Sequence, residues 1–182
     1  MKALGWCLFD TAVGPCGLAW SGQGICAVQL PEATPALTRQ RMARITHGAA
    51  EAPPTAEARQ AVAIVQALLA GQPHDDSAIV LDMRGVSDFQ RRVYAITRRI
   101  PPGQTRTYGE IAAELGDKRL ARAVGQALGL NPFAPVIPCH RVLAAGHKPG
   151  GFSAHGGAHT KLRMLATEGA LQVGQASLFD GL

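Results

Sequence analysis

The chain changes character near residue 85, from a mixture of strand and helix patterns to a mostly helical pattern, and this change limits the possible folds more than any other feature. Residues 4–30 contain short apolar runs that are separated by turn-forming residues at Gly14-Pro15 and Gly22-Gln23-Gly24. Short apolar runs between such turns are typical of antiparallel strands joined by hairpins. The sequence therefore predicts a strand meander at this end of the chain.

Helical spacing begins after the meander. The apolar positions of residues 56–69 recur at helical intervals, and a short helix is also expected within residues 35–45. The run Ile-Val-Leu-Asp at residues 79–82 is interpreted as a last strand. Residues 1–85 are thus predicted to form a small α+β domain.

The second half has the pattern of a mostly helical domain, predicted over residues 86–170. Ser87 can cap its first helix, and Pro101 ends the helical pattern. Thr107 and Glu110 form a possible capping box at the start of the next helix. The apolar stripe of the first helix consists of Phe89, Val93, Ile96 and Ile100.

Two further helices are expected to lie close together. They are predicted over residues 108–115 and 119–128, with a tight turn at 116–118. This arrangement has the shape of a DNA-binding helix-turn-helix, although a plain helical hairpin gives the same pattern. A last helix is expected over residues 158–167, and residues 171–182 form a tail.

The composition is that of an ordinary globular protein. Hydrophobic residues make up 47% and charged residues 17% of the 182 positions. No run approaches the ~18 apolar residues that a membrane span needs, and the start of the chain lacks the apolar core of a signal peptide. We therefore expect a cytoplasmic monomer with no membrane partner.

The positive charge is concentrated in the second half. Residues 1–85 carry six Lys/Arg and seven Asp/Glu, a net charge of −1, whereas residues 86–182 carry twelve and six, a net charge of +6. A basic domain suggests a polyanionic partner, and nucleic acid is the commonest one.

Three of the four cysteines, Cys7, Cys16 and Cys26, lie close together in the sequence. Disulfides are disfavoured in a cytosolic chain. A metal site that uses these thiols with His47 or His74 is conceivable, but there is no Cys-x-x-Cys pair. The spacing fits small buried residues on neighbouring strands, so no metal is predicted.

The fourth cysteine, Cys139, stands in a different context. An apolar run ends at Pro138, so Cys139 is expected in a turn beneath the preceding helix. Thiolates are the nucleophilic form of cysteine, and the adjacent imidazole of His140 and guanidinium of Arg141 are expected to lower the thiol pKa. His140 could accept the proton if a carboxylate orients it, and Glu168 is the available candidate.

The residues around Cys139 resemble the active-site signature of the O6-alkylguanine-DNA alkyltransferase family. The resemblance is strong over about residues 87–170 and weak over residues 5–30. The matching blocks are Asn131-Pro132, Val136-Ile137-Pro138-Cys139-His140-Arg141-Val142, Arg122-Ala123-Val124-Gly125, Gly151-Phe152-Ser153, Lys161 and Glu168.

For catalysis, the resemblance implies that Cys139 attacks the alkyl carbon on guanine O6 in an in-line displacement and keeps the alkyl group as a thioether. His140 would act as the base through a bridging water, and Glu168 would polarise it. Tyr108 would hydrogen-bond the base and help guanine leave as a neutral species. Asn131 would hinge the recognition helix onto the active-site loop.

For DNA binding, the resemblance implies that Arg122 fills the gap left by a base that has rotated out of the duplex. Lys118 and Arg119 are expected to contact phosphates, which gives affinity that falls with salt. The other residues expected to contact the DNA or to line the substrate pocket are Ala121, Arg141, Val142, Phe152 and Ser153.

The chemistry that follows is a single-turnover repair without a cofactor. A thiolate cannot reach guanine O6 inside a stacked duplex, so the nucleotide has to be flipped out. A thioether has no easy reversal, which implies one transfer for each polypeptide. The expected partner is double-stranded DNA that contains O6-alkylguanine, and O4-alkylthymine is a further expected substrate.

Two departures from the family pattern concern the pocket and the N-terminal half. The loop over residues 152–157 is about two residues longer than the commoner form, and Phe152 stands where many relatives have Tyr, so the preferred alkyl size stays open. The family counterpart of the N-terminal half is a structural domain that resembles ribonuclease H. Some relatives carry zinc there, but the cysteine spacing of this chain does not clearly match that site.

The tail contains Gln175, Leu178 and Phe179 in the order Gln-x-x-Leu-Phe. This order is similar to the peptide with which bacterial proteins dock into the replicative sliding clamp, and a Leu-Phe pair suits a binding pocket. The alternative is that Leu178 and Phe179 cover the core of this protein.

Three other functions remain as alternatives. A lesion-binding protein would flip damaged guanine without transferring the alkyl group, but relatives of that kind replace the cysteine. A helix-turn-helix regulator would need a dimer element that the sequence does not show. A cysteine hydrolase would have no use for Arg122 on a DNA-facing helix.

Overall fold

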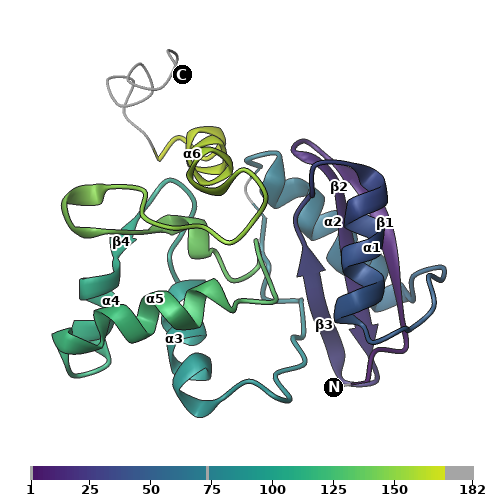
Figure 1. Cartoon of the computed structure of the whole chain (residues 1–182), viewed down its shortest axis with the longest axis horizontal. Coiled ribbons are helices and arrows are strands. Elements are labelled where there is room, and N and C mark those ends of the chain that lie inside the picture. Colours follow the sequence, from purple (N-terminus) through teal and green to yellow (C-terminus); the bar gives the residue numbers. More distant parts are fainter. Residues whose placement is uncertain (1, 73, 171–182) are drawn as a thin grey trace.

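The computed structural model describes residues 2–72 and 74–170, and these form two halves that lie side by side (Figure 1). The first half is a small sheet with two helices, and the second consists mostly of helices. The resulting mixed α and β architecture agrees with the predicted α+β class at this coarse level. Within the described part of the chain, no helix is long and apolar enough to cross a membrane.

The sheet of the first half is the predicted meander. Strands β1 (Gly5–Thr11), β2 (Gly14–Ser21) and β3 (Gly24–Gln29) pair antiparallel in the order β1-β2-β3. Helix α2 (Ala56–Leu69) forms at the positions that the apolar spacing predicts, and α1 (Pro35–Ile45) is the short helix expected within residues 35–45. Threonine side chains cap both helices at their first turns.

The two helices cover opposite faces of this sheet. Met42 of α1 packs with Trp6, Ala19 and Cys26, whereas the buried face of α2 belongs to the main core with Leu18. Figure 1 shows the strands between the two helices. The main core continues into the second half, so one hydrophobic cluster supports both halves.

The strand predicted at residues 79–82 is not formed. Leu81 makes a single parallel bridge with Ile25, and the extended pairing ends there. Val80 and Asp82 share backbone hydrogen bonds with Ile25, and after them the buried carboxylate of Asp82 accepts hydrogen bonds from Ser21 Oγ at 2.6 Å and from the backbone N–H of Arg84 at 3.1 Å.

The second half begins with α3 (Asp88–Arg98), which Ser87 and Gln90 start through a reciprocal capping box. Thr107 and Glu110 form the second predicted capping box. The remaining elements are β4 (Arg106–Thr107), α4 (Tyr108–Glu114), η1 (Lys118–Leu120), α5 (Ala121–Gly129), η2 (Cys139–Arg141), β5 (Val142–Leu143), η3 (Ala145–His147) and α6 (Gly157–Thr167), where η denotes a 3₁₀ helix.

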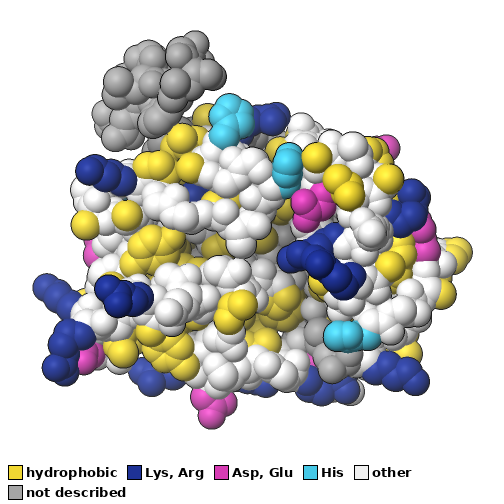
Figure 2. Space-filling model, in the orientation of Figure 1, with side chains coloured by type: hydrophobic (Ala, Val, Ile, Leu, Met, Phe, Trp, Pro, Cys, Tyr) yellow, Lys and Arg dark blue, Asp and Glu magenta, His cyan; other side chains and the backbone are white. Residues whose placement is uncertain are grey.

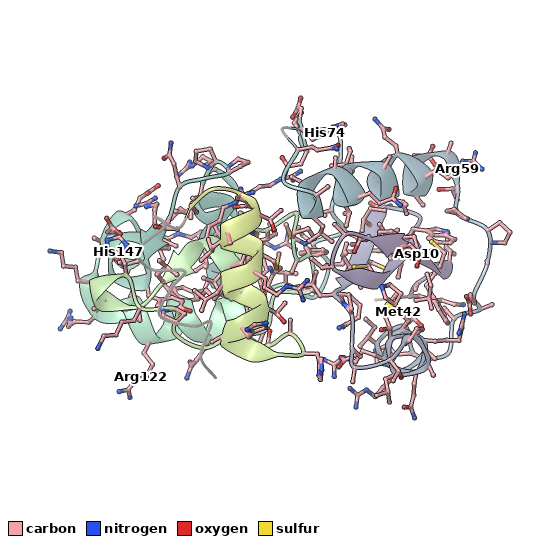
Figure 3. All side chains as sticks on the ribbon, turned by 90° about the horizontal axis from the view of Figure 1, so that it is seen from above. Asp10, Met42, Arg59, His74, Arg122 and His147 are labelled. Carbon is pink, nitrogen blue, oxygen red and sulfur yellow. The ribbon has the colours of Figure 1, made fainter. Side chains whose placement is uncertain are left out.

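Two connections hold the loop before Cys139 against the rest of the molecule. Val28 of β3 donates its backbone N–H to the carbonyl of Pro132 at 2.8 Å. On the other side of η2, β5 pairs in parallel with β4. Helix α6 then crosses the middle of the molecule when it is seen from above (Figure 3). The segment around Cys139 is therefore held in place by contacts with the sheet, with β4 and with α6.

Candidate active site

Cys139 is the first residue of the short helix η2, directly after Pro138. Its backbone N–H donates to the carbonyl of Ile137 at 2.8 Å, which closes a tight turn after the buried pair Val136 and Ile137. The residue is only 6% exposed. The local sequence thus creates the predicted turn and buries the thiol within it.

A pocket of about 490 Å³ opens above the thiol. Its lining includes Cys139, Tyr108 from α4, Arg122 from α5, and Phe152 and Ser153 from the loop before α6. In Figure 2 hydrophobic side chains are visible in a hollow on this face of the molecule. The structure therefore brings together residues that are far apart in the sequence around one cysteine.

Glu168 binds the two side chains that follow Cys139. Its Oε1 atom lies 2.8 Å from His140 Nε2 and also accepts a hydrogen bond from Arg141 Nη2 at 2.8 Å. Arg141 Nε donates to the second oxygen of Glu168 at 2.9 Å, and Arg141 Nη1 donates to the carbonyl of Ile100. His140 and Glu168 are paired as expected, and Arg141 binds the same carboxylate.

This cluster corrects the prediction that Arg141 contacts DNA. The side chain of Arg141 is 7% exposed, and its guanidinium faces Glu168 and the end of α3 rather than the surface. A buried guanidinium needs a bidentate partner, and Glu168 is that partner.

His140 is best described as a neutral imidazole that is ready to accept a proton. Burial lowers the pKa of His140, and this effect outweighs the hydrogen bond with Glu168, which raises it. Burial alone would raise the pKa of Glu168, but hydrogen bonds from His140 and Arg141 lower it to about 2. Because the ionised carboxylate faces Nε2, that nitrogen carries the proton and Nδ1 is the acceptor. Among the residues that the structure describes, nothing hydrogen-bonds to the buried Nδ1.

The thiol environment also differs from the prediction. Burial raises the pKa of Cys139, and the largest opposing effects come from Asn131 and Lys161 rather than from His140 and Arg141. The adjacent imidazole is neutral, and the adjacent guanidinium is compensated by Glu168. Neighbours in the sequence therefore do not supply the charge that a thiolate needs.

Asn131 connects the end of α5 to the segment that carries the thiol. Its side-chain Nδ2 donates to the carbonyl of Ile137 at 2.8 Å, and its Oδ1 accepts from the backbone N–H of Phe133 at 2.9 Å. Both bonds fold residues 131–137 into a closed loop.

Tyr108 stands at the side of the pocket and is half-buried. Burial raises its pKa, as does the neighbouring Cys139, so the phenol keeps its proton at neutral pH. Gly150 has a φ of +65°, and a Cβ atom there would lie 3.4 Å from the Tyr108 ring. The positive φ therefore favours glycine at this position in the loop.

The expected pocket residues do not all lie in the pocket. Phe152 and Ser153 line it, but Val142 is fully buried and is absent from its lining. The carbonyl of Val142 instead accepts a hydrogen bond from Lys161 Nζ at 2.5 Å.

The predicted DNA-facing side chains are mostly exposed. Arg122 lines the pocket and extends outward from the molecule (Figure 3). Lys118 is exposed, and Arg119 is 91% exposed although it pairs with Asp117 at 2.9 Å. Ala121 is half-buried and also lines the pocket.

Lys161 is the residue whose importance the sequence reasoning missed. The family resemblance includes Lys161 but gives it no role, whereas the structure buries it fully, with its Nζ near the ring of Tyr108. A signal was present in the sequence, because Lys161 shares one face of its helix with Met164 and Leu165, which are buried.

The remaining cysteines lie in the cores. Cys7 and Cys16 belong to the main cluster, and Cys26 belongs to the cluster under α1. Burial raises the pKa of all three thiols. In residues 2–72 and 74–170, no group of His, Cys, Asp and Glu side chains is arranged to hold a metal.

Comparisons with known proteins agree on one family. The family model for the 6-O-methylguanine DNA methyltransferase DNA-binding domain matches residues 88–170. A methylated-DNA–protein-cysteine methyltransferase from Mycobacterium tuberculosis is 37% identical over 171 residues, which cover 94% of this chain and 96% of that protein. The protein of the same name from Mycolicibacterium paratuberculosis is 49% identical over 102 residues, 56% of this chain and 60% of that protein. A crystal structure of Mycobacterium tuberculosis OGT in complex with DNA aligns with a TM-score of 0.73 and 35% identity, covering 96% of this chain and 99% of that one.

Proposed function

The chain belongs to the methylated-DNA–protein-cysteine methyltransferase family, and from this premise we propose that Cys139 is the cysteine that accepts the alkyl group. The function is direct-reversal DNA repair, in which an alkyl group moves from guanine O6 to a protein cysteine. The observation that carries the assignment of Cys139 is its position in the wall of the 490 Å³ pocket, next to the Glu168–His140 pair.

The proton of the thiol goes to His140. Nδ1 of the neutral imidazole has no partner among the described residues, and a bridging water would join it to the thiol. Glu168 keeps the other ring nitrogen protonated, so the acceptor is always available. The role of Glu168 is to hold the tautomer and to stabilise the imidazolium.

The transfer itself is one displacement. The sulfur of Cys139 forms a bond to the alkyl carbon while the bond from that carbon to O6 breaks, and the electron pair of that bond goes to guanine. Tyr108 gives the guanine anion a proton and recovers one from His140 through solvent. In sum, the thiol proton ends on guanine, and the protein keeps a thioether.

The damaged base reaches the thiol by leaving the duplex. Unstacking costs a few kcal/mol, and the Arg122 side chain offsets part of this when it enters the gap. Arg122 is suited to this role because it is exposed at the pocket. Lys118 and Arg119 contact phosphates, and the small side chain of Ala121 allows close approach of the DNA.

The pocket determines which alkyl groups are accepted. Phe152 packs on the base and Ser153 offers a hydroxyl to it, while Asn131 keeps the loop beneath closed. The same displacement applies to O4-alkylthymine, which presents an equivalent carbon on an exocyclic oxygen.

The domain organisation follows the two halves. Residues 1–85 form a ribonuclease-H-like structural domain, and residues 86–170 form the DNA-binding and transfer domain. Helices α4 and α5 are a helix-turn-helix, in which α5 reads the DNA. This assignment is supported by the turn at η1 and by the exposed cations at the start of α5.

The tail over residues 171–182, with Gln175, Leu178 and Phe179, lies outside the described residues. We propose, from its sequence alone, that it docks into a bacterial sliding clamp. Deletion of residues 174–182 is expected to abolish co-migration of the otherwise monomeric protein with the clamp. Unchanged co-migration would contradict clamp docking.

The test of the proposed function is stoichiometric. A fixed amount of protein is titrated with duplex that contains O6-methylguanine, and the restored guanine is measured after digestion of the DNA. We expect a plateau at one restored base for each protein molecule, none with Cys139→Ala, and an unchanged plateau with the control Cys7→Ala. Continued repair beyond one base would contradict a single transfer.

A further inference from the structure

A second cavity, of about 280 Å³, also has Cys139 in its wall. Cys139, Phe152 and Ser153 line both this cavity and the 490 Å³ pocket, so the two cavities meet at the thiol. One side of the second cavity is formed by β3 and α1, and the other by the end of α5 and the loop that follows it. It therefore lies between the two halves of the molecule, and we call it the lateral groove.

The displacement at Cys139 needs room beside the sulfur for any alkyl group larger than methyl. In an in-line attack the sulfur, the attacked carbon and guanine O6 lie on one line, and the other substituents of that carbon project sideways. When the base lies in the 490 Å³ pocket, a longer chain has to extend past the sulfur, where the lateral groove begins. A water molecule occupies about 30 Å³ in the liquid, so the 280 Å³ of the groove can hold several methylene units.

The walls of the lateral groove offer apolar surface together with a cation. Ala134 and Ala154 are small, and Leu130 is 70% exposed. An alkyl chain that covers Leu130 removes apolar surface from water, which is favourable. On the side of the N-terminal half, Arg41 of α1 lines the groove with an exposed side chain. The groove thus has contacts for methylene groups and for a negative charge.

Arg41 has no carboxylate partner among the described residues. The ion pairs found there join other side chains. Glu32 lies by the same stretch of α1, but its Oε1 accepts a hydrogen bond from Gln29 Nε2 at 3.3 Å. Arg39, two residues before Arg41, is already paired with Glu51. The guanidinium of Arg41 is therefore available to bind a carboxylate through two parallel hydrogen bonds.

We propose that Arg41 is a specificity-determining residue of the transfer, and that it favours lesions whose alkyl group ends in a carboxylate. The inference rests on the proposed function of Cys139 and names a substrate class for it, the O6-carboxyalkylguanines whose chain enters the lateral groove. The bond changes are those of methyl transfer. The sulfur bonds to the first carbon of the chain, the bond from that carbon to O6 breaks with its electron pair going to guanine, and the carboxylate takes no part.

Other cations near the site do not replace Arg41. Arg141 is buried and held by Glu168, and Lys161 is fully buried. Arg122 lines the 490 Å³ pocket but not the lateral groove. Within the part of the chain that the structure describes, Arg41 is thus the one basic side chain that lines the groove. The N-terminal half would in this way take part in substrate recognition.

The experiment uses two lesions that differ only in charge. Duplexes carry either O6-(4-carboxybutyl)guanine or its uncharged amide, O6-(4-carbamoylbutyl)guanine, at the same position. Single-turnover transfer is followed by the mass of the peptide that contains Cys139, and the ratio of the acid rate to the amide rate is determined for each protein. Because both lesions react at the same first carbon, their intrinsic reactivities cancel when the ratios of two proteins are compared.

The variants are Arg41→Gln, which removes the charge, and Arg41→Glu, which reverses it. Arg44→Gln is the matched control, since Arg44 is exposed on the same helix but does not line the groove. We expect the acid-to-amide ratio of Arg41→Gln to be at least about threefold below that of the wild type, the order of effect of a solvent-accessible charge pair. Arg41→Glu should lower the ratio further, and Arg44→Gln should keep the wild-type ratio.

The proposal is overturned if Arg41→Gln keeps the wild-type ratio, or if Arg44→Gln lowers the ratio as much, since the general field of α1 would then be responsible. Equal slowing of acid and amide in Arg41→Gln also contradicts it and would indicate that Arg41 acts on the DNA. Transfer of methyl but of neither longer chain by the wild type would show that the groove does not take alkyl chains.

Duplex that contains O6-methylguanine separates this inference from the proposed function. If Cys139 accepts no methyl group, the proposed function fails. Methyl transfer together with a ratio that does not respond to Arg41 contradicts this inference alone.

Discussion

At the scale of single residues, Glu168 is the carboxylate that links two other side chains of the site. One carboxylate binds the imidazole of His140 and the guanidinium of Arg141, and its pKa falls from 4.5 to about 2 on folding. A carboxylate whose pKa is lower in the folded state contributes stability above pH 4.5, and this contribution is lost as the pH falls toward 2. The shift corresponds to about 3 kcal/mol at neutral pH.

This linkage predicts the effect of Glu168→Gln. At pH 7 the variant should be less stable by about 3 kcal/mol, because Arg141 is left buried without its partner. Between pH 4.5 and 3 the difference from the wild type should become smaller, since the wild type loses the same contribution by protonation. Urea unfolding at several pH values measures this, and a difference that stays constant with pH would contradict the coupling.

Two tyrosines near the site allow an effect on stability to be distinguished from an effect on alkyl transfer. Tyr94 is fully buried and donates to the carbonyl of Ala127 at 2.9 Å, whereas Tyr108 is half-buried at the pocket. We expect Tyr94→Phe to lower the free energy of unfolding by about 1 kcal/mol and to leave alkyl transfer intact. Tyr108→Phe should do the reverse, with unchanged stability and a transfer slowed at least about tenfold.

The measurement for this pair is denaturant unfolding together with single-turnover transfer kinetics. Each tyrosine serves as the control for the other, because the same hydroxyl group is removed in both variants. A normal transfer rate in Tyr108→Phe would remove Tyr108 from the proposed proton path.

At the scale of elements, the turn at η1 and the start of α5 present the cations that we propose to meet DNA. Lys118, Arg119 and Arg122 are exposed there, and Arg122 also lines the pocket. We therefore expect these side chains to have two separable effects. Phosphate contacts determine salt-dependent affinity, whereas an inserted side chain determines how easily the base leaves the duplex.

Arg122→Ala tests the second effect. We expect transfer from duplex O6-methylguanine to slow at least about tenfold, which corresponds to about 1.4 kcal/mol of lost compensation for flipping. Transfer from the free base O6-benzylguanine, which needs no flipping, should be unchanged. Equal slowing with both substrates would indicate a damaged pocket instead. In the control Arg119→Ala, the slope of log affinity against log salt should fall by about one while flipping is retained.

At the scale of the whole molecule, local signals predicted the elements better than the site. The capping boxes at Ser87 and Thr107 and the hairpin glycines depend on neighbouring residues, and the elements they mark formed as expected. The strand expected at residues 79–82 is reduced to one bridge, and Asp82 at its end binds Ser21, a partner that is distant in the sequence.

The electrostatics of the site could not be predicted for the same reason. Sequence adjacency suggested that His140 and Arg141 act on Cys139, but successive side chains of a 3₁₀ turn point in different directions, and both of these face Glu168. The groups that oppose the effect of burial on the thiol pKa are led by Asn131, at the end of α5, and Lys161 of α6. Neither is adjacent to Cys139 in the sequence.

The central claim is that Cys139 becomes the permanent carrier of the alkyl group. The most direct measurement is the intact mass of the protein after incubation with duplex that contains O6-methylguanine. We predict a gain of one methylene unit, assigned by fragmentation to Cys139 and absent in Cys139→Ala. An unchanged mass in the presence of restored guanine, or an adduct on Cys7, Cys16 or Cys26, would contradict the account.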